Sequence, residues 1–312
     1  MDRPVLSVVI PFHNEGAMVD ALARRLLPVL AALRLPWEAV LVDDGSTDAT
    51  WSRLTALRAA AGRRGRVRLV RLSRTFGQQA ALTAGLDLAR GAAVAILDAD
   101  LQDPPELLKE FVRRWRRGDA IVVGVRASRR EGIVKRSAYR LYYSLLARLS
   151  PLPIQPDAGD FCLLDRRVVD LLRRMPERNR FLRGLRSWVG FRQGLVRYAR
   201  PERAAGRPAY TWGKLFQLGL DGIASFSYVP LRASAVLGAV VALAGVAFAL
   251  FAVVAHFSWP VPIPSGWASQ VVLTSVLGGT QLVALGVIGE YLARVYDEAK
   301  QRPTYIVRDL VE

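Results

Sequence analysis

Ala92-Ala93-Val94-Ala95-Ile96-Leu97 is an apolar run that ends in Asp98-Ala99-Asp100-Leu101-Gln102-Asp103. A short, continuously apolar run is typical of a strand that is buried on both faces of a parallel sheet. The acidic residues follow where such a strand ends, in a chain whose formal net charge is +17. This stretch therefore predicts a buried parallel strand with a carboxylate site at its carboxyl end.

The same arrangement occurs twice earlier in the chain. The run 6–12 leads into His13-Asn14-Glu15, and the run 38–42 leads into Asp43-Asp44-Gly45-Ser46-Thr47-Asp48. Amphipathic helical stretches separate these runs, and two further apolar runs lie at 67–72 and 120–125. The alternation predicts an α/β fold with a mainly parallel sheet and helices on both faces. Ligands bind beyond the carboxyl ends of such strands, so we expect the acidic loops to form the site.

Helix capping explains only some of these acidic loops. Ser46, Thr47 or Asp48 can cap the helix that follows them. Capping does not explain Asp98 and Asp100 together, because two carboxylates this close repel each other unless a cation lies between them. Hard oxygen ligands with open coordination positions suit Mg²⁺ or Mn²⁺ shared with a diphosphate. Asp103 precedes two prolines and either joins this group or caps the next helix.

The composition limits the classes of partner. The chain has 312 residues, a pI of about 11.0 and a positive mean hydropathy of +0.19. A chain that is both basic and hydrophobic suits an anionic membrane surface or a phosphorylated ligand. No nucleic-acid-binding motif accompanies the charge, so we expect no nucleic-acid partner. Cys162 is the single cysteine, which excludes an internal disulfide and a cysteine-rich metal site.

Two apolar runs near the C-terminus predict membrane spans. Residues 233–257 and 267–289 are uncharged and each is long enough to cross a bilayer, whereas a buried core helix is the alternative. The short proline-containing connector 258–265 predicts a two-helix hairpin. Lys and Arg residues flank the hairpin and are absent from the connector, so both termini should be cytoplasmic.

These patterns predict the domain organisation and the location of the protein. We expect a catalytic domain at 1–228, a transmembrane hairpin at 229–294 and a cytoplasmic tail at 295–312, in a two-span protein of the cell inner membrane. Basic residues surround apolar positions at helical spacing within 129–149. This profile predicts an amphipathic helix at the membrane interface, and a helix packed on the domain with a solvated basic face is the alternative.

The chain resembles the family 2 glycosyltransferases of the GT-A, Rossmann-like fold, and among them the polyprenyl-phosphate glycosyltransferases, which include the bactoprenol glucosyltransferases and dolichol-phosphate mannose synthase. The first resemblance lies in Ser7-Val8-Val9-Ile10-Pro11, Val42-Asp43-Asp44-Gly45-Ser46 and Asp98-Ala99-Asp100-Leu101-Gln102-Asp103. The second lies in Gly159-Asp160-Phe161, Arg180-Phe181-Leu182-Arg183-Gly184, Pro230-Leu231-Arg232 and Gly286-Val287-Ile288-Gly289-Glu290-Tyr291. The order and spacing of these motifs make the resemblance specific.

The resemblance implies a reaction and a set of partners. A sugar would pass, with anomeric inversion, from a nucleotide diphosphate sugar to the phosphate of a membrane polyprenol such as undecaprenol. A UDP-sugar such as UDP-glucose is favoured as the donor, with Mg²⁺ or Mn²⁺ as the cofactor. A lipid acceptor would account for a catalytic domain held at the bilayer. Small residues in the second span would also permit a homo-oligomer.

The resemblance also implies roles for individual residues. Asp100 and Asp160 are the expected catalytic residues, and Asp160 serves either as a base or to orient a substrate. The metal is expected at Asp98, Asp100 and Gln102. The nucleotide sugar is expected at Pro11, Phe12, Glu15, Asp43, Asp44, Asp98, Ala99, Gln102 and Arg126. The lipid phosphate is expected at Lys135, Arg136, Arg180, Arg183 and Arg203.

Two departures from the family pattern affect the expected phosphate site. Cys162 stands where relatives commonly have arginine, and the Ser-Lys that relatives often carry before the membrane region is absent, so Arg207 or Lys214 substitutes for it. Two other functions remain as alternatives. One is a processive polysaccharide synthase, which needs more spans and usually a Gln-x-x-Arg-Trp motif. The other is an inactive membrane partner subunit that keeps the fold.

Overall fold

The computed structural model describes residues 4–60, 66–126, 158–178, 180–199, 229–258 and 266–312. These residues fall into two compact units, one formed by 4–199 together with 302–312 and the other by 229–301. The amphipathic helix expected at 129–149 lies outside the described residues, as do Lys135, Arg136, Arg203, Arg207 and Lys214.

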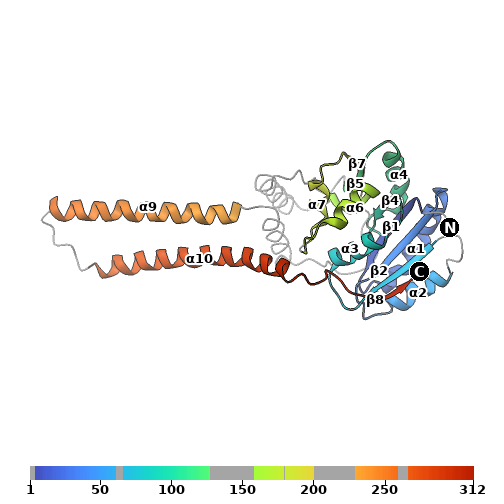
Figure 1. Cartoon of the computed structure of the whole chain (residues 1–312), viewed down its shortest axis with the longest axis horizontal. Helices are drawn as coiled ribbons and strands as arrows, with labels where there is room; N and C mark the ends of the chain where they lie inside the picture. The colour runs from blue at the N-terminus through green and yellow to red at the C-terminus, as the bar shows by residue number, and fades with distance from the viewer. Residues whose placement is uncertain (1–3, 61–65, 127–157, 179, 200–228, 259–265) are drawn as a thin grey trace. The chain divides into compact units, whose positions relative to one another are not determined.

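The first unit is an α/β structure built on one eight-stranded sheet (Figure 1). Its strands are β1 (Leu6–Phe12), β2 (Trp37–Asp43), β3 (Arg66–Leu72), β4 (Ala93–Ile96), β5 (Ile121–Arg126), β6 (Ala158–Asp165), β7 (Gln193–Tyr198) and β8 (Val307–Val311). Its helices are α1 (Gly16–Ala32), α2 (Thr50–Ala60), α3 (Gln78–Leu88), the 3-10 turn η2 (Pro105–Leu107), α4 (Leu108–Arg116), α6 (Arg166–Arg174) and α7 (Leu182–Trp188).

The sheet is mixed but mostly parallel, as the sequence predicts. Its strand order is β7-β5-β6-β4-β1-β2-β3-β8. Strands β4, β1, β2 and β3 run parallel to one another, and β5 runs parallel to β7. Strand β6 runs antiparallel between β4 and β5, and β8 runs antiparallel along β3. Parallel neighbours place the ends of β1, β2 and β4 at one edge of the sheet, where the acidic loops begin.

Helices cover both faces of the sheet, and successive side chains of β1 pack against helices on opposite faces. Val8 and Ile10 belong to a buried cluster that includes Met18 of α1 and Phe111 of α4. Val9 points to the opposite face, where α3 packs so closely that a Cβ at Gly85 would lie 2.2 Å from Val9 Cγ1. Both faces of β1 are therefore buried from water, which explains why its successive residues are apolar.

The end of the chain adds a strand to the sheet. β8 lies within the tail expected at 295–312 and covers the outer edge of β3. The Tyr305 hydroxyl donates to Asp87 Oδ2 at 2.9 Å, and Glu312 Oε1 accepts from Arg68 Nη2 at 2.5 Å. Arg68 is buried and also lies 3.7 Å from Glu38, which is itself buried. The last residues are thus part of the first unit, which is called the catalytic unit below because it contains the predicted site.

The second unit contains α9 (Val229–Ser258) and α10 (Trp267–Ala299), two long helices that contact each other (Figure 1). Among the described side chains, large apolar residues of both helices are exposed, including Leu243 at 70% and Leu282 at 71%. Among the described residues, the segment Val276–Ala299 is long and apolar enough to cross a membrane, judged by length and composition. Ala233–Phe248 is a shorter apolar helix, so the prediction of a two-span hairpin is confirmed only in part.

Candidate active site

The loop after β2 is organised by the carboxylate of Asp44. Its Oδ1 accepts the Phe76 amide at 2.7 Å and its Oδ2 accepts the Gly77 amide at 2.9 Å. The preceding carboxylate, Asp43, accepts the Ser46 amide at 3.1 Å and lies 3.4 Å from Arg71 Nε. Both residues are buried. They fix the β2 loop against the loop that follows β3, and they lie at the edge where a nucleotide is expected.

The β1 and β2 loops are joined by side chain to backbone hydrogen bonds. Asn14 has a positive φ of 54° and its Oδ1 accepts the Thr47 amide at 2.9 Å. Asp48 accepts the Thr50 amide at 3.0 Å and the Gly16 amide at 3.1 Å, so it caps α2, as one of the expected candidates, and also holds the start of α1. Burial opposes ionisation of Asp48, but these hydrogen bonds lower its pKa below the usual value.

A glycine is required where the loop after β2 meets the loop after β3. Gly45 has a φ of 61°, and a Cβ there would lie 2.4 Å from the Arg74 carbonyl carbon. Pro11 is partly exposed, whereas the Phe12 side chain is buried in the core cluster. Phe12 contributes to the loop region through its carbonyl, which accepts the Asp44 amide at 2.8 Å. Glu15 is partly exposed, and its amide donates to Thr50 Oγ1 at 3.0 Å.

The acidic loop after β4 turns sharply so that its carboxylates remain near one another. Leu101 adopts a positive φ of 57°, and the Gln102 amide donates to Asp100 Oδ1 at 3.1 Å. Gln78 of α3 donates to Asp98 Oδ1 at 3.1 Å. Ala99, between the two carboxylates, is buried in the core cluster. The loop therefore presents Asp98 and Asp100 while its own backbone is held in place.

Asp98 is an unusual carboxyl group. Burial, followed by the negative charges of Asp160, Asp103 and Asp100, raises its pKa from 3.8 to about 7. Like charges gathered in this way are the condition that a bound cation relieves, so these residues fit a hard divalent metal. Within the described ranges no three His, Cys, Asp or Glu residues form a metal-binding cluster, so substrate oxygens would have to complete the coordination.

Asp103 does not cap the turn that follows it. η2 begins after Pro104 with no side-chain cap, whereas Asp103 is buried and accepts a hydrogen bond from the Tyr198 hydroxyl at the end of β7. Arg126 Nη2 of β5 lies 3.8 Å from Asp103 Oδ1. Burial and Asp103 together raise the pKa of Tyr198. Tyr198 has no signal in the sequence, because a tyrosine at the end of an alternating run is common in any sheet.

Asp160 of β6 is held by an arginine fork. Arg183 of α7 donates from Nε to Oδ1 at 2.8 Å and from Nη2 to Oδ2 at 3.2 Å. Burial opposes ionisation of Asp160, but Arg183, Arg186 and Arg126 hold its pKa below the usual value. The structure thus brings together Asp160, predicted as a catalytic residue, and Arg183, predicted to bind the lipid phosphate, and the carboxylate is ionised at neutral pH.

Three further residues of this region are Arg180, which was predicted to bind phosphate, Cys162 and Arg186. Arg180 Nη2 donates to the Leu172 carbonyl, at the end of α6. Cys162 is buried, and burial raises the pKa of its thiol despite the neighbouring Arg186. Arg186 is the site arginine that sequence reasoning missed. It lies three residues after Arg183 in an arginine-rich stretch, where nothing distinguishes it from a solvated side chain.

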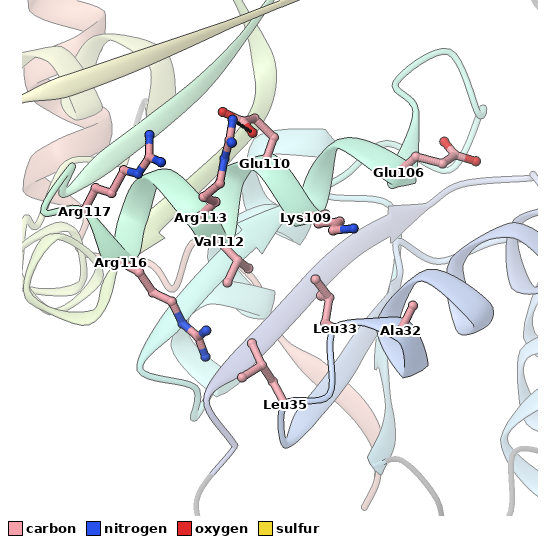
Figure 2. A pocket seen from close by; sticks show the side chains of 10 residues that line it. All are labelled: Ala32, Leu33, Leu35, Glu106, Lys109, Glu110, Val112, Arg113, Arg116 and Arg117. Atoms are coloured by element: carbon pink, nitrogen blue, oxygen red, sulfur yellow. Dashed lines mark ion pairs between the residues drawn. The ribbon is translucent and has the colours of Figure 1, made fainter.

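A groove of about 640 Å³ lies away from these residues, between the end of α1 and α4 (Figure 2). Leu33, Leu35 and Val112 form its apolar part, and charged side chains of α4 surround it. Its acidic residues already form ion pairs, with Glu110 Oε2 bound by Arg113 and Glu106 Oε2 2.8 Å from Arg25. The groove contains none of the predicted site residues, so its size does not mark the active site.

Comparison with known proteins gives a family match, curated relatives and a more distant structural likeness. The family model "Glycosyl transferase family 2" matches residues 7–172. An uncharacterized glycosyltransferase of Synechocystis sp. is 44% identical over 98% of this chain and 95% of its own length. The bactoprenol glucosyl transferase of Shigella phage SfV is 36% identical over 97% of this chain and 98% of its own length. The UDP complex of glucosyl-3-phosphoglycerate synthase from Mycobacterium tuberculosis aligns at 22% identity with a TM-score of 0.45, covering 71% of this chain and 78% of that one.

Proposed function

The chain belongs to glycosyl transferase family 2 and is a glycosyltransferase, and from this premise we propose that it transfers a sugar from a nucleotide diphosphate sugar to polyprenyl phosphate. The observation that carries the proposal is the 36% identity to a bactoprenol glucosyl transferase over nearly the full length of both chains. That length includes α9 and α10, whose exposed apolar side chains suit a lipid acceptor.

The donor binds at the loops after β1, β2 and β4 in this proposal, and it is a UDP-sugar, with UDP-glucose as the first candidate. Asp43 and Asp44 hold the nucleoside loops, and Pro11, Phe12 and Glu15 border them. Asp98, Asp100 and Gln102 would hold Mg²⁺ or Mn²⁺, with Asp100 as the direct ligand. The cation would neutralise the charge that develops on the departing diphosphate.

The acceptor needs little help from a base. A phosphate monoester has its second pKa at about 6, so its attacking oxygen is already ionised at neutral pH. Asp160 has a lowered pKa and both of its oxygens accept from Arg183. We therefore assign Asp160 to positioning Arg183, which with Arg126 and Arg180 would bind phosphate. Lys135, Arg136 and Arg203 are proposed to bind the lipid phosphate as well.

The reaction takes place at the cytoplasmic face of the inner membrane in this proposal. The basic residues that flank 233–257 and 267–289 support two spans with both termini inside. Alkaline phosphatase fused after Pro264 should be active, because the enzyme folds only outside the cytoplasm, and the same enzyme fused after Glu312 should be inactive. Activity of the second fusion alone would reverse the orientation.

The test of the function is sugar transfer by the purified full chain in detergent. Undecaprenyl phosphate, Mn²⁺ or Mg²⁺ and a panel of radiolabelled UDP- and GDP-sugars are supplied, and labelled lipid is extracted. We expect one UDP-sugar to label the lipid with inversion, and Asp100→Asn to lower the rate by at least about 100-fold while the protein stays folded. A water-soluble polymer product would indicate a processive synthase, and nucleotide binding without transfer would indicate an inactive partner subunit.

A further inference from the structure

Arg186 is a buried cation whose hydrogen-bonding capacity the described fold does not fill. The residue is 5% exposed, its Nη1 donates to the Gly159 carbonyl at a long 3.4 Å, and its guanidinium group also forms a hydrogen bond with Cys162. Its Nε is buried and has no hydrogen-bond partner among the described residues. A guanidinium group has five N–H donors, and buried charges in proteins are normally paired and hydrogen-bonded. Other arginines of the described fold also have an unpartnered nitrogen, so it is the position of Arg186 beside Asp160 that points to a ligand.

The surroundings of Arg186 place it in the site. It lies three residues after Arg183, a spacing that brings two side chains to the same side of a helix, and Arg183 holds Asp160. Arg126 lies against Gly159, where a Cβ would be 3.3 Å from Arg126 Nη2. Gly159 therefore contacts two arginines, one at its carbonyl and one at its α-carbon. Three guanidinium groups surround the dipeptide Gly159-Asp160.

Charges of both signs gather around this dipeptide. The described ion pairs connect Asp160 to Arg183 and Asp103 to Arg126, and Asp98 and Asp100 lie close enough to interact with these carboxylates. The Nε of Arg126 also lacks a hydrogen-bond partner in the described part of the chain. The combined field of the arginines is strong enough to keep the buried Asp160 ionised. A ligand with several acceptor oxygens would supply the hydrogen bonds that Arg126 and Arg186 lack.

We propose that Arg186 is a phosphate-binding residue and that, with Arg126, it takes a phosphate group beside Asp160. The chemistry of a phosphate fits, because its oxygens accept hydrogen bonds from several arginines at once. The proposal rests on the proposed function in that the phosphate comes either from the donor diphosphate or from the lipid acceptor. A purely structural arginine, which joins β6 to α7, is the competing explanation.

Arg186→Met separates these explanations without any turnover. Arg183 still pairs with Asp160 in this variant, so the ligand-free protein should stay folded and unfold close to the wild-type temperature. The rise in melting temperature that inorganic phosphate, or UDP with Mn²⁺, gives to the wild type should be lost. A ligand-free melting temperature lowered by several degrees, with both ligand effects retained, would establish a structural role. Arg174→Met, at an exposed position of α6, is the matched control and should behave as wild type.

Kinetics identify the source of the phosphate. A KM for the UDP-sugar raised at least 10-fold, with loss of the UDP effect, assigns Arg186 to the donor. A KM for undecaprenyl phosphate raised at least 10-fold, with loss of the inorganic phosphate effect, assigns it to the acceptor. Arg186→Lys keeps the charge but not the forked geometry, and it carries the test if the methionine variant does not fold. Unchanged KM values in Arg186→Lys together with retained ligand effects would overturn the proposal.

The two proposals fail in different ways. If the wild type transfers no sugar to undecaprenyl phosphate, the proposed acceptor is wrong, yet the melting experiments with inorganic phosphate and UDP still decide whether Arg186 binds a phosphate. If the wild type transfers sugar and Arg186→Met does so with unchanged kinetics, the proposed function stands and Arg186 has no part in it.

Discussion

Asp98 is a carboxyl group that the ligand-free protein holds about half protonated at neutral pH, because its pKa is raised to about 7. The usual pKa of 3.8 applies to the unfolded chain, so between these two values the folded protein binds more protons than the unfolded chain. The contribution of Asp98 to the free energy of unfolding therefore falls as the pH rises from about 4 to about 7. The repulsion between Asp98 and the neighbouring carboxylates therefore lowers the stability of the ligand-free protein.

Replacing this carboxyl group should stabilise the ligand-free protein only where Asp98 is ionised. In EDTA at pH 8, Asp98→Asn should raise the melting temperature by about 2–4 °C for each kcal/mol of repulsion removed. At pH 5 both proteins carry a neutral side chain, so the gain should nearly vanish. Differential scanning fluorimetry at the two pH values measures this, with the exposed Asp20→Asn as the control. An equal rise in melting temperature at both pH values would show that charge repulsion is not its cause.

At Gly45 the close approach of the Arg74 backbone leaves no room for a side chain. Gly45→Ala requires a positive φ and brings a Cβ within 2.4 Å of the Arg74 backbone, so strain and overlap together should cost about 3 kcal/mol or more. Gly118→Ala is the matched control, because Gly118 also has a positive φ, of 100°, but has open space around it. We expect Gly45→Ala to lower UDP affinity at least 10-fold as well, measured by titration calorimetry. Equal melting temperatures in the two variants would show that overlap of the new Cβ with the Arg74 backbone does not destabilise the protein.

At the scale of elements, hydrophobic pattern predicted the strands that are buried on both faces. The runs that became β1 and β4 are continuous and apolar, and the acidic residues after β4 predicted where Asp98 and Asp100 would lie. β8 was missed because Arg308 and Asp309 interrupt its apolar residues, and its pairing with β3 depends on contacts distant in sequence. Arg186 and Tyr198 were missed for the same reason, since only the folded chain distinguishes a buried arginine or tyrosine from an exposed one.

The attachment of β8 gives a prediction for a single element. Arg68→Met removes the buried cation shared by Glu38 and Glu312, and breaking such a buried pair costs about 3–5 kcal/mol. Arg90→Met removes an exposed partner of Glu312 and should cost less than about 1 kcal/mol. Hydrogen exchange of residues 307–311 should accelerate in Arg68→Met and remain slow in Arg90→Met. Slow exchange in both would show that backbone pairing alone holds β8.

At the scale of the whole molecule, the chain leaves the catalytic unit after β7, forms α9 and α10, and returns to it as β8. A truncation after Tyr228 therefore removes two things, the long helices and the eighth strand. A variant in which a flexible Gly/Ser linker replaces residues 229–301 removes the helices and keeps 302–312.

We expect the linker variant to separate nucleotide binding from access to lipid. It should keep its UDP-dependent rise in melting temperature and its transfer to a short, water-soluble polyprenyl phosphate. Transfer to undecaprenyl phosphate in vesicles should fall by at least about 10-fold, because the bilayer no longer concentrates enzyme and acceptor together. Truncation after Tyr228 should in addition lower the melting temperature. Full activity of the linker variant in vesicles would show that α9 and α10 have no part in lipid access.

The late position of β8 also imposes an order of events on the ribosome. Domains fold as their residues emerge, so β1 to β7 are available before the long helices have been made. During that interval β3 is an open sheet edge, which is a template for pairing with another newly made chain. The edge of β3 therefore stays open until residues 307–311 have left the ribosome and can pair with it.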